Sequence, residues 1–433
     1  MNRNIYALAT PPGYSALAII RVTGVDSHKI LKKIFKPIAK RQKNYVATRG
    51  NFSNIDDVVC IKYPDKRSFT GERSFEIIFH GNPVIANLMF KRLESEGVVL
   101  ANPGEFTLRS YLSGKINLVQ AEAVSRLILS NSEKAAQAAL KSLHDGFCDV
   151  IGDISDFVLK LFCEIEVRLN FPEDELLDNI SWNYIRQELI EYIRKVNRIL
   201  ETGDIGFKIK KGIIIAICGM PNVGKSTLLN SICGEKKSLV YNLPGTTRDS
   251  IEATISIYGY NFTFIDTAGI NLNVCDPVEE MGIEQTKKNM RNANIVLYIE
   301  DSQSDEVLAL NNLQGFVLEI VNKIDVSCNC KGISAYTGKG VKVLLKSILL
   351  FVFFNTNIDI KNEVMANKRQ RFEFEKIYKS FNVILSYLIV KNPNEDLIVE
   401  ELNQINLSLK NLNGQDVKKQ VLNEIFDRFC IGK

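Results

Sequence analysis

Four short motifs hold residue types that together can bind a nucleoside triphosphate. In the first, "GMPNVGKST" (219–227), the pattern GxxxxGK[ST] follows the apolar run "GIIIAIC" and precedes "LLNSICG". Gly219 and Gly224 let the backbone curl so that its N–H groups face phosphate oxygens. Lys225 supplies a positive charge for the terminal phosphates, and the Ser226 hydroxyl can ligate Mg²⁺. Taken alone, this motif also fits a glycine-rich turn that only opens a helix.

The other three motifs follow in the order expected of a guanine-nucleotide site. Asp266 in "DTAG" can hold the Mg²⁺ shell, and Gly269 can sense the terminal phosphate. In "NKID", Asp325 can accept both the ring N–H and the exocyclic amine of guanine, a donor pair that adenine lacks. Backbone groups of "SAYTG" (334–338) can bind the guanine oxygen. Together the motifs predict that the chain binds GTP. The residues that they assign to the nucleotide are Gly219, Asn222, Val223, Gly224, Lys225, Ser226, Thr227, Asp266, Thr267, Ala268, Gly269, Asn322, Lys323, Asp325, Ser334 and Ala335.

The residue after DTAG bears on how GTP would be hydrolysed. Ras-like GTPases place a Gln there to orient the attacking water, whereas this chain has Ile270. The side-chain carbonyl of Asn222 could instead help to bind a monovalent cation. Carbonyl groups of "YNLPGTTRD" (241–249) could complete the coordination shell of that cation, and Thr247 could reach Mg²⁺. A carboxylate in "DPVEEMGIEQT" could position the water. Plainer interpretations remain, since loop asparagines often cap turns and acidic residues before a helix often serve its dipole.

The hydrophobic pattern divides the chain into blocks that would position these motifs. Residues 1–116 mix short β-type runs such as "SALAIIRV" with Pro and Gly breakers, which predicts an N-terminal α+β domain. In 117–211 apolar residues recur every three or four positions along one helical face, and this pattern returns in 357–433. Between them, residues 212–356 alternate buried-strand runs with glycine loops and helices, which is a parallel α/β pattern. The predicted fold class is α/β and α: an N-terminal α+β domain, then a helical domain that contains an inserted P-loop GTPase domain with a Ras-like, mostly parallel sheet.

Composition places the chain among ordinary globular proteins. Apolar residues make up 45% and charged residues 24% of its 433 residues, and the net charge of +4 permits an RNA partner without demanding one. The first residues lack the apolar core of a signal peptide, and the most apolar stretch, "VKVLLKSILLFVFF" (341–354), is too short to cross a bilayer. The nine cysteines are scattered and odd in number. We therefore expect reduced thiols, a cytoplasmic location and no membrane partner.

The chain ends on "FDRFCIGK" (426–433), which is apolar for a chain end. Termini are usually the least constrained part of a domain, so this composition predicts that the tail packs against another part of the protein. The tail contains Cys430, three residues before the last. Its thiol could act as a nucleophile or could be a small buried hydrophobe.

Seven motifs extend over nearly the whole chain: "GMPNVGKSTLLN", "GTTRD", "DTAG", "MGIEQ", "ATPPG", "PGEFTLRSYLSGKINLVQAEA" and "FCIGK". They closely resemble motifs of the MnmE (TrmE) family of tRNA modification GTPases. The resemblance implies an N-terminal domain that dimerises and binds a folate one-carbon donor, such as 5-formyltetrahydrofolate or another tetrahydrofolate. It also implies that the homodimer forms a heterotetramer with the flavin-dependent partner MnmG (GidA). Together they would place a carboxymethylaminomethyl or aminomethyl group on the wobble uridine of certain tRNAs.

The resemblance also implies roles for particular residues. The implied ligand sets are Asn222, Tyr241, Leu243 and Thr246 for K⁺, Ser226 and Thr247 for Mg²⁺, and Arg21, Glu76, Lys115 and Lys433 for folate. Tyr241, Thr246 and Thr247 thereby join the nucleotide site. Glu279, rather than its neighbour Glu280, would orient the water, and Cys430 would lie near the one-carbon unit. Folate carboxylates suit the cationic side chains, and the donors of the pterin ring suit the glutamate.

A different class of function fits the GTPase motifs alone, namely a ribosome-assembly GTPase that acts as an RNA-binding switch. That function predicts an appended RNA-binding module, such as a KH domain with its GxxG loop. In this chain an apolar helical block and "FCIGK" follow the GTPase motifs instead.

Overall fold

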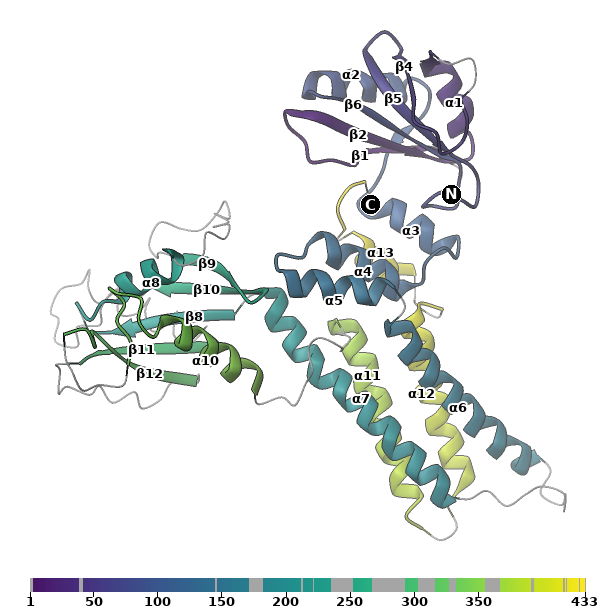
Figure 1. The fold of residues 1–433 in the computed structure, drawn as a ribbon. Coiled ribbons are helices and arrows are strands. Elements are labelled where there is room, and N and C mark those ends of the chain that lie inside the picture. Colours follow the sequence, from purple (N-terminus) through teal and green to yellow (C-terminus); the bar gives the residue numbers. More distant parts are fainter. Residues whose placement is uncertain are drawn as a thin grey trace, which may run out of the picture. The chain divides into compact units, whose positions relative to one another are not determined.

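The computed structural model divides the chain into two compact units, whose elements are labelled in Figure 1. The first contains Met1–Ile128, Ser142–Ile180 and Ile389–Lys433, and the second contains Leu129–Lys141 and Ser181–Leu388. The structure describes residues 3–38, 42–144, 146–170, 182–211, 213–220, 222–234, 252–266, 293–302, 316–326, 332–354, 367–390, 393–415, 417, 419–427 and 429–432.

A seven-stranded sheet forms the N-terminal part of the first unit (Figure 1). Its strands are β1 (Ile5–Leu8), β2 (Ser15–Thr23), β3 (Phe35–Pro37), β4 (Thr48–Phe52), β5 (Asp56–Tyr63), β6 (Ser74–Gly81) and β7 (Val99–Leu100). The spatial order is β3-β4-β5-β6-β2-β1-β7, and neighbouring strands are antiparallel except for β1 and β7. The α+β fold predicted for this part of the chain is confirmed.

The two faces of this sheet differ because successive side chains of a strand point to opposite sides. On one face, residues such as Ile20 pack with α1 (Ser27–Ile34) and α2 (Pro83–Glu94) into a buried apolar core. On the other face, Arg21 and Glu76 are register partners on β2 and β6. The alternation that builds the core therefore also sets two charged residues side by side.

Helices form the rest of the first unit. They are α3 (Glu105–Leu112), α4 (Leu118–Ile128), α6 (Gly146–Asn170), α12 (Glu395–Asn413) and α13 (Lys419–Phe426). α12 contacts α6, and α13 contacts α3, so the C-terminal helices pack on helices from much earlier in the chain. The helical face predicted after residue 117 is divided among α4, α5 (Glu133–Leu143) and α6. α5 begins where the Ser132 hydroxyl accepts a hydrogen bond from the Ala135 N–H at 3.2 Å, and most of this helix belongs to the second unit.

The second unit contains a five-stranded sheet with the strand order β12-β11-β8-β10-β9. Its strands are β8 (Ile213–Gly219), β9 (Glu252–Ile257), β10 (Tyr260–Asp266), β11 (Ile295–Asp301) and β12 (Phe316–Asn322). Neighbours are parallel except for β9 and β10, which confirms the predicted, mostly parallel sheet. Ile217 and Cys218 of β8 are buried in cores on opposite faces, which explains why this strand is continuously apolar. The unit also contains α7 (Trp182–Lys211), α8 (Lys225–Gly234), α10 (Val341–Phe354) and α11 (Lys368–Tyr387).

Within the described ranges, no helix combines the length and the apolarity that crossing a bilayer requires. This includes α10, which corresponds to the most apolar stretch of the sequence.

Candidate functional site

The nucleotide motifs meet at one edge of the five-stranded sheet. β8, β10, β11 and β12 run in the same direction and end at Gly219, Asp266, Asp301 and Asn322. β8 lies between β11 and β10, so the chain leaves the sheet in its middle where the phosphate loop begins. Ligands of open α/β sheets bind in the crevice outside such carboxyl ends. The topology therefore gathers motifs that are far apart in sequence.

The phosphate loop turns sharply between β8 and α8. Gly219, Asn222 and Gly224 have positive φ angles of 151°, 62° and 96°. A Cβ at Gly219 would collide with the carbonyl oxygen of Ile299, and a Cβ at Gly224 would collide with Nδ2 of Asn322, so both positions require glycine. Asparagine is among the residues that tolerate positive φ. The backbone therefore gives Asn222 a reason for its presence that is independent of any cation.

Lys225 folds back over this loop. Its Nζ donates to the carbonyl oxygens of Gly219 at 3.0 Å and Met220 at 2.9 Å, and the residue is only 8% exposed. Ser226 follows it in the first turn of α8 and is exposed. A lysine and free N–H groups at a helix N-terminus favour a phosphate, and a hydroxyl oxygen is a suitable ligand for Mg²⁺. The start of α8 is thus suited to bind the phosphates of a nucleoside triphosphate together with Mg²⁺.

Asn322 connects the guanine motifs to the phosphate loop. Its side chain is buried, with 1% of the residue exposed. Nδ2 donates to the carbonyl oxygen of Val223 at 2.8 Å, and Oδ1 accepts from the N–H of Ala335 at 2.9 Å. One amide therefore satisfies two backbone groups from different loops. Sequence analysis assigned Asn322 to the nucleotide, and the structure gives it this bridging contact in addition.

Asp325 lies just beyond β12 and is exposed. The neighbouring loop is folded on itself, because the Ser334 hydroxyl accepts from the Thr337 N–H at 3.1 Å. Lys323 forms an ion pair of 2.6 Å with Asp301 at the end of the adjacent strand. These contacts fix the segments on either side of Asp325 and leave its carboxylate accessible to the edge of a base.

Several predicted site residues lie outside the described residues. They are Tyr241, Leu243, Thr246, Thr247, Thr267, Ala268, Gly269, Glu279 and Lys433. For Asp266 the structure gives only its backbone position at the end of β10. Ser226 and Asn222 are therefore the members of the Mg²⁺ and K⁺ sets whose positions are known. In the described part of the chain, no three His, Cys, Asp or Glu side chains cluster so that they could hold a metal ion.

A second polar site lies on the face of the N-terminal sheet opposite its core. Arg21 bonds Oε1 of Glu76 from Nε at 2.8 Å and from Nη2 at 2.7 Å. The Tyr63 hydroxyl donates to Oε2 of the same carboxylate at 3.0 Å. Burial and the neighbouring Glu76 raise the pKa of Tyr63 to about 12, so its hydroxyl stays a donor at neutral pH. The structure brings together two of the four predicted folate residues and adds Tyr63 to them.

Two aromatic rings lie near the guanidinium of Arg21. Its central carbon lies 5.8 Å from the ring centroid of Phe69 and 5.9 Å from that of Phe106. Phe69 belongs to the segment 64–73, which we call the Phe69 loop. Lys115 reaches the same loop, where its Nζ donates to the carbonyl oxygen of Lys66 at 2.6 Å. Sequence reasoning missed both rings, although Phe106 lies within the motif "PGEFTLRSYLSGK".

The C-terminal tail packs on the first unit, as its apolar composition predicted. Phe426 is buried in a cluster with residues of α4. The N–H of Gly104 donates to the carbonyl oxygen of Cys430 at 3.4 Å, and a Cβ on Gly432 would lie 2.7 Å from the carbonyl oxygen of Leu8. Cys430 itself is exposed, which rules out the interpretation of this residue as a buried hydrophobe.

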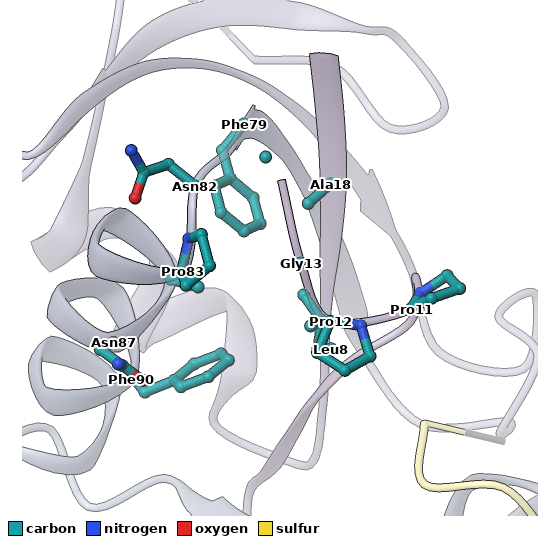
Figure 2. Close-up of a pocket in the computed structure, with 12 residues that line it drawn as sticks. Leu8, Pro11, Pro12, Gly13, Ala18, Phe79, Asn82, Pro83, Asn87 and Phe90 are labelled. Carbon is teal, nitrogen blue, oxygen red and sulfur yellow. The ribbon is translucent and has the colours of Figure 1, made fainter. Parts of the chain in front are cut away.

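A small apolar cavity lies beside the "ATPPG" segment (Figure 2). Pro11 and Pro12 line one side, and Phe79 and Phe90 line the other. Its volume is about 100 Å³, whereas pockets for larger organic ligands usually measure about 300–1,000 Å³. The cavity is too small for a folate, and the three predicted folate residues that the structure describes, Arg21, Glu76 and Lys115, do not line it.

Comparison with known proteins gives matches along the whole chain. The family model "GTP-binding protein TrmE N-terminus" matches residues 4–115, and "MnmE helical domain" matches residues 118–430. A Thermotoga maritima protein named tRNA modification GTPase MnmE is 33% identical over 454 residues, which cover 99% of each chain. Proteins of the same name from Nitrosomonas europaea and Aquifex aeolicus are 32% and 31% identical, and the matches cover at least 99% of each chain.

Proposed function

Because this chain belongs to the MnmE family of tRNA modification GTPases, we propose that it couples GTP hydrolysis to modification of the wobble uridine of certain tRNAs. The structural observation that carries the nucleotide part of this proposal is the Asn322 bridge. It holds the guanine-reading segment against the phosphate loop, so that one nucleotide can contact both. The alternative of a ribosome-assembly switch predicted an RNA-binding module after the GTPase domain, where this chain instead has α11, α12 and α13.

The residues at the start of α8 have defined tasks in GTP hydrolysis. Water attacks the terminal phosphorus, the bond to the bridging oxygen breaks, and GDP and phosphate leave. The ammonium of Lys225, which now bonds two loop carbonyls, moves onto the phosphate oxygens and offsets their charge. Ser226 and Thr247 would hold Mg²⁺, and Asn222 with Tyr241, Leu243 and Thr246 would hold K⁺; bound there, the cations would supply positive charge beside the phosphates. Glu279 would orient the water, because Ile270 cannot.

The second polar site is proposed to bind the folate one-carbon donor. Two of the five N–H donors of Arg21 are committed to Glu76, so the remaining donors can take a ligand carboxylate. Lys115 and Lys433 supply further positive charge, and Glu76 faces the pterin donors. The tail brings exposed Cys430 to this unit, where we place it near the one-carbon group. The working assembly is a cytoplasmic homodimer with a flavin-dependent partner, MnmG, and tRNA.

GTP turnover by the purified protein is expected to be at least about tenfold faster in K⁺ than in Na⁺ at equal ionic strength. The reason is that the cation occupies the role of an arginine finger, which contributes about 10³–10⁵ in rate. Phosphate release measured in both salts checks this. Asn222→Ala should remove the difference. Equal rates in the unchanged protein would exclude the K⁺ site.

Replacing Gly104 tests both the tRNA function and the role of the tail. Gly104 has φ +66°, and a Cβ there would collide with the carbonyl oxygen of Phe426, so Gly104→Ala should displace the tail. We expect the unchanged gene to restore modified wobble uridine in cells that lack the protein, and Gly104→Ala to restore severalfold less while GTP turnover is retained. Mass spectrometry of tRNA nucleosides measures the modification.

Gly97→Ala is the matched control for that experiment. Gly97 has φ +80°, but no atom lies within 4 Å of the added Cβ. The backbone strain of the two substitutions is thus similar, at about 1–2 kcal/mol, and only one of them disturbs the tail. Full modification by Gly104→Ala would show that the tail is dispensable. Failure of the unchanged gene to restore any modified nucleoside would refute the tRNA function itself.

A further inference from the structure

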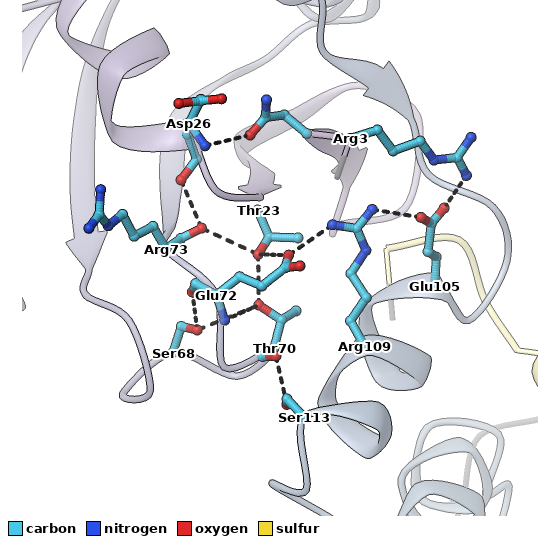
Figure 3. Close-up of polar contacts among 12 residues, drawn as sticks. Arg3, Thr23, Asp26, Ser68, Thr70, Glu72, Arg73, Glu105, Arg109 and Ser113 are labelled. Carbon is cyan, nitrogen blue, oxygen red and sulfur yellow. Dashed lines mark hydrogen bonds and ion pairs between the residues drawn. The ribbon is translucent and has the colours of Figure 1, made fainter. Parts of the chain in front are cut away.

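Arg109 of α3 lies at the centre of a chain of ion pairs beside the second polar site (Figure 3). Its Nη1 bonds Oε2 of Glu72 and its Nη2 bonds Oε1 of Glu105, each at 2.8 Å, and 4% of its side chain is exposed. Glu105 also accepts from Arg3 and from the backbone N–H of Asn102, each at 2.9 Å. A buried guanidinium is tolerated only when partners compensate its charge, as two carboxylates do here.

The two carboxylates that Arg109 binds belong to different parts of the fold. Glu105 is in α3, one turn before Arg109, so that contact stays within a helix. Glu72 belongs to the Phe69 loop, so its contact attaches this loop to the helix. Burial alone would raise the pKa of Glu105, but the Asn102 N–H and the guanidinium groups of Arg109 and Arg3 outweigh it and lower the pKa. Glu105 is therefore a charged partner of Arg109 at neutral pH.

The Phe69 loop is fastened at further points around Glu72. The Ser113 hydroxyl donates to the carbonyl oxygen of Thr70 at 2.8 Å, and the Thr70 hydroxyl lies 2.7 Å from that of Thr23 on β2 (Figure 3). The Ser68 hydroxyl donates to the carbonyl oxygen of Glu72. These bonds involve neutral groups. The contact with Arg109 joins two side chains of opposite charge, and the Arg109 side chain is only 4% exposed, so we expect this contact to hold the loop strongly.

Resting on the proposed folate function, we infer that Arg109 is a positioning residue of the folate site, which acts through Glu72 on the Phe69 loop. Phe69, which is 38% exposed, and the buried Phe106 of the Arg109 helix both lie within 6 Å of the Arg21 guanidinium. By attaching the Phe69 loop to this helix, Arg109 fixes the position of Phe69 beside Arg21. When the loop is held in place, the Arg21–Glu76 pair is already oriented before the ligand binds. No binding free energy is then spent on ordering the site.

The test compares two isosteric substitutions that each remove one 2.8 Å ion pair from Arg109. Glu72→Gln loosens the loop, whereas Glu105→Gln leaves the loop attached. Titration calorimetry of the full-length variants with 5-formyltetrahydrofolate measures affinity, and thermal unfolding measures stability. Both variants should unfold at lower temperature. Glu72→Gln should bind about tenfold more weakly, and Glu105→Gln should bind within about twofold of the unchanged protein.

A second readout separates positioning from a general loss of stability. If Glu72 acts through Phe69, the double variant Glu72→Gln with Phe69→Ala should bind no more weakly than Phe69→Ala alone. Ser113→Ala removes a neutral hydrogen bond to the same loop and should also weaken folate binding. This variant keeps the inference testable if Glu72→Gln does not fold. Equal affinity losses in Glu72→Gln and Glu105→Gln would overturn the inference alone. No binding by the unchanged protein would overturn the folate function, and the inference with it.

Discussion

Asp325→Asn is expected to lower the affinity for GTP by about a thousandfold and to create affinity for xanthosine triphosphate instead. The carboxylate of Asp325 is exposed beyond β12, where it can accept the ring N–H and the exocyclic amine of guanine. An asparagine amide turns a donor toward that amine, so one bond is lost and two donors face each other. Xanthine has a carbonyl oxygen at that position and restores the pair. Equilibrium titration with fluorescent analogues of both nucleotides measures the exchange.

Asp325→Ala is the control for this exchange of specificity. It removes the acceptor oxygens without adding a donor, so the affinity for GTP should fall and the affinity for xanthosine triphosphate should stay low. Undiminished GTP affinity in Asp325→Asn would mean that the carboxylate does not contact the base. The assignment of the "NKID" segment to guanine would then be wrong.

Asn322→Ala is expected to weaken GTP binding by about a hundredfold, although its amide need not touch the nucleotide. The substitution leaves the carbonyl oxygen of Val223 and the N–H of Ala335 without their partner. Each buried group left unsatisfied costs about 1–3 kcal/mol, and the two groups lie in the phosphate loop and the guanine loop. Both halves of the site should therefore relax apart. The same fluorescence titration measures the loss.

Asn294 provides the matched control in the same sheet. Its Oδ1 accepts from the N–H of Ile214 at 2.9 Å, at the end of β8 that is remote from the phosphate loop. Asn294→Ala should lower the unfolding temperature and leave the affinity for GTP within about twofold. Comparable affinity losses in the two variants would indicate that Asn322 contributes to the stability of the sheet and not to the geometry of the site.

The turn of the phosphate loop could be predicted from the sequence because its motif is local. Gly219 and Gly224 have backbone angles and close neighbours that only glycine allows. Their spacing in a short segment of sequence therefore predicts the conformation of the loop. The buried runs of the parallel sheet are likewise visible as continuous apolar segments. The division between α4 and α5 was harder to foresee, because it depends on a cap at Ser132 within an otherwise continuous repeat.

The tertiary structure alone decided which distant residues meet. Arg21 and Glu76 are 55 positions apart, and the alternation of β2 and β6 could place them on one face but could not make them neighbours. The same holds for Tyr111, whose hydroxyl donates to the carbonyl oxygen of Gly414, 303 positions away, where α3 receives the C-terminal helices.

By itself, therefore, the sequence determined the mixed fold class, the motifs of a GTPase and the apolar character of the tail. The folded chain determined that Asn322 joins two loops, that Arg109 reaches the Phe69 loop, and that Cys430 is exposed. The physical reason is that local backbone and burial preferences are written in neighbouring residues. Strand order and helix packing come from the balance of all buried contacts at once, which no single segment contains.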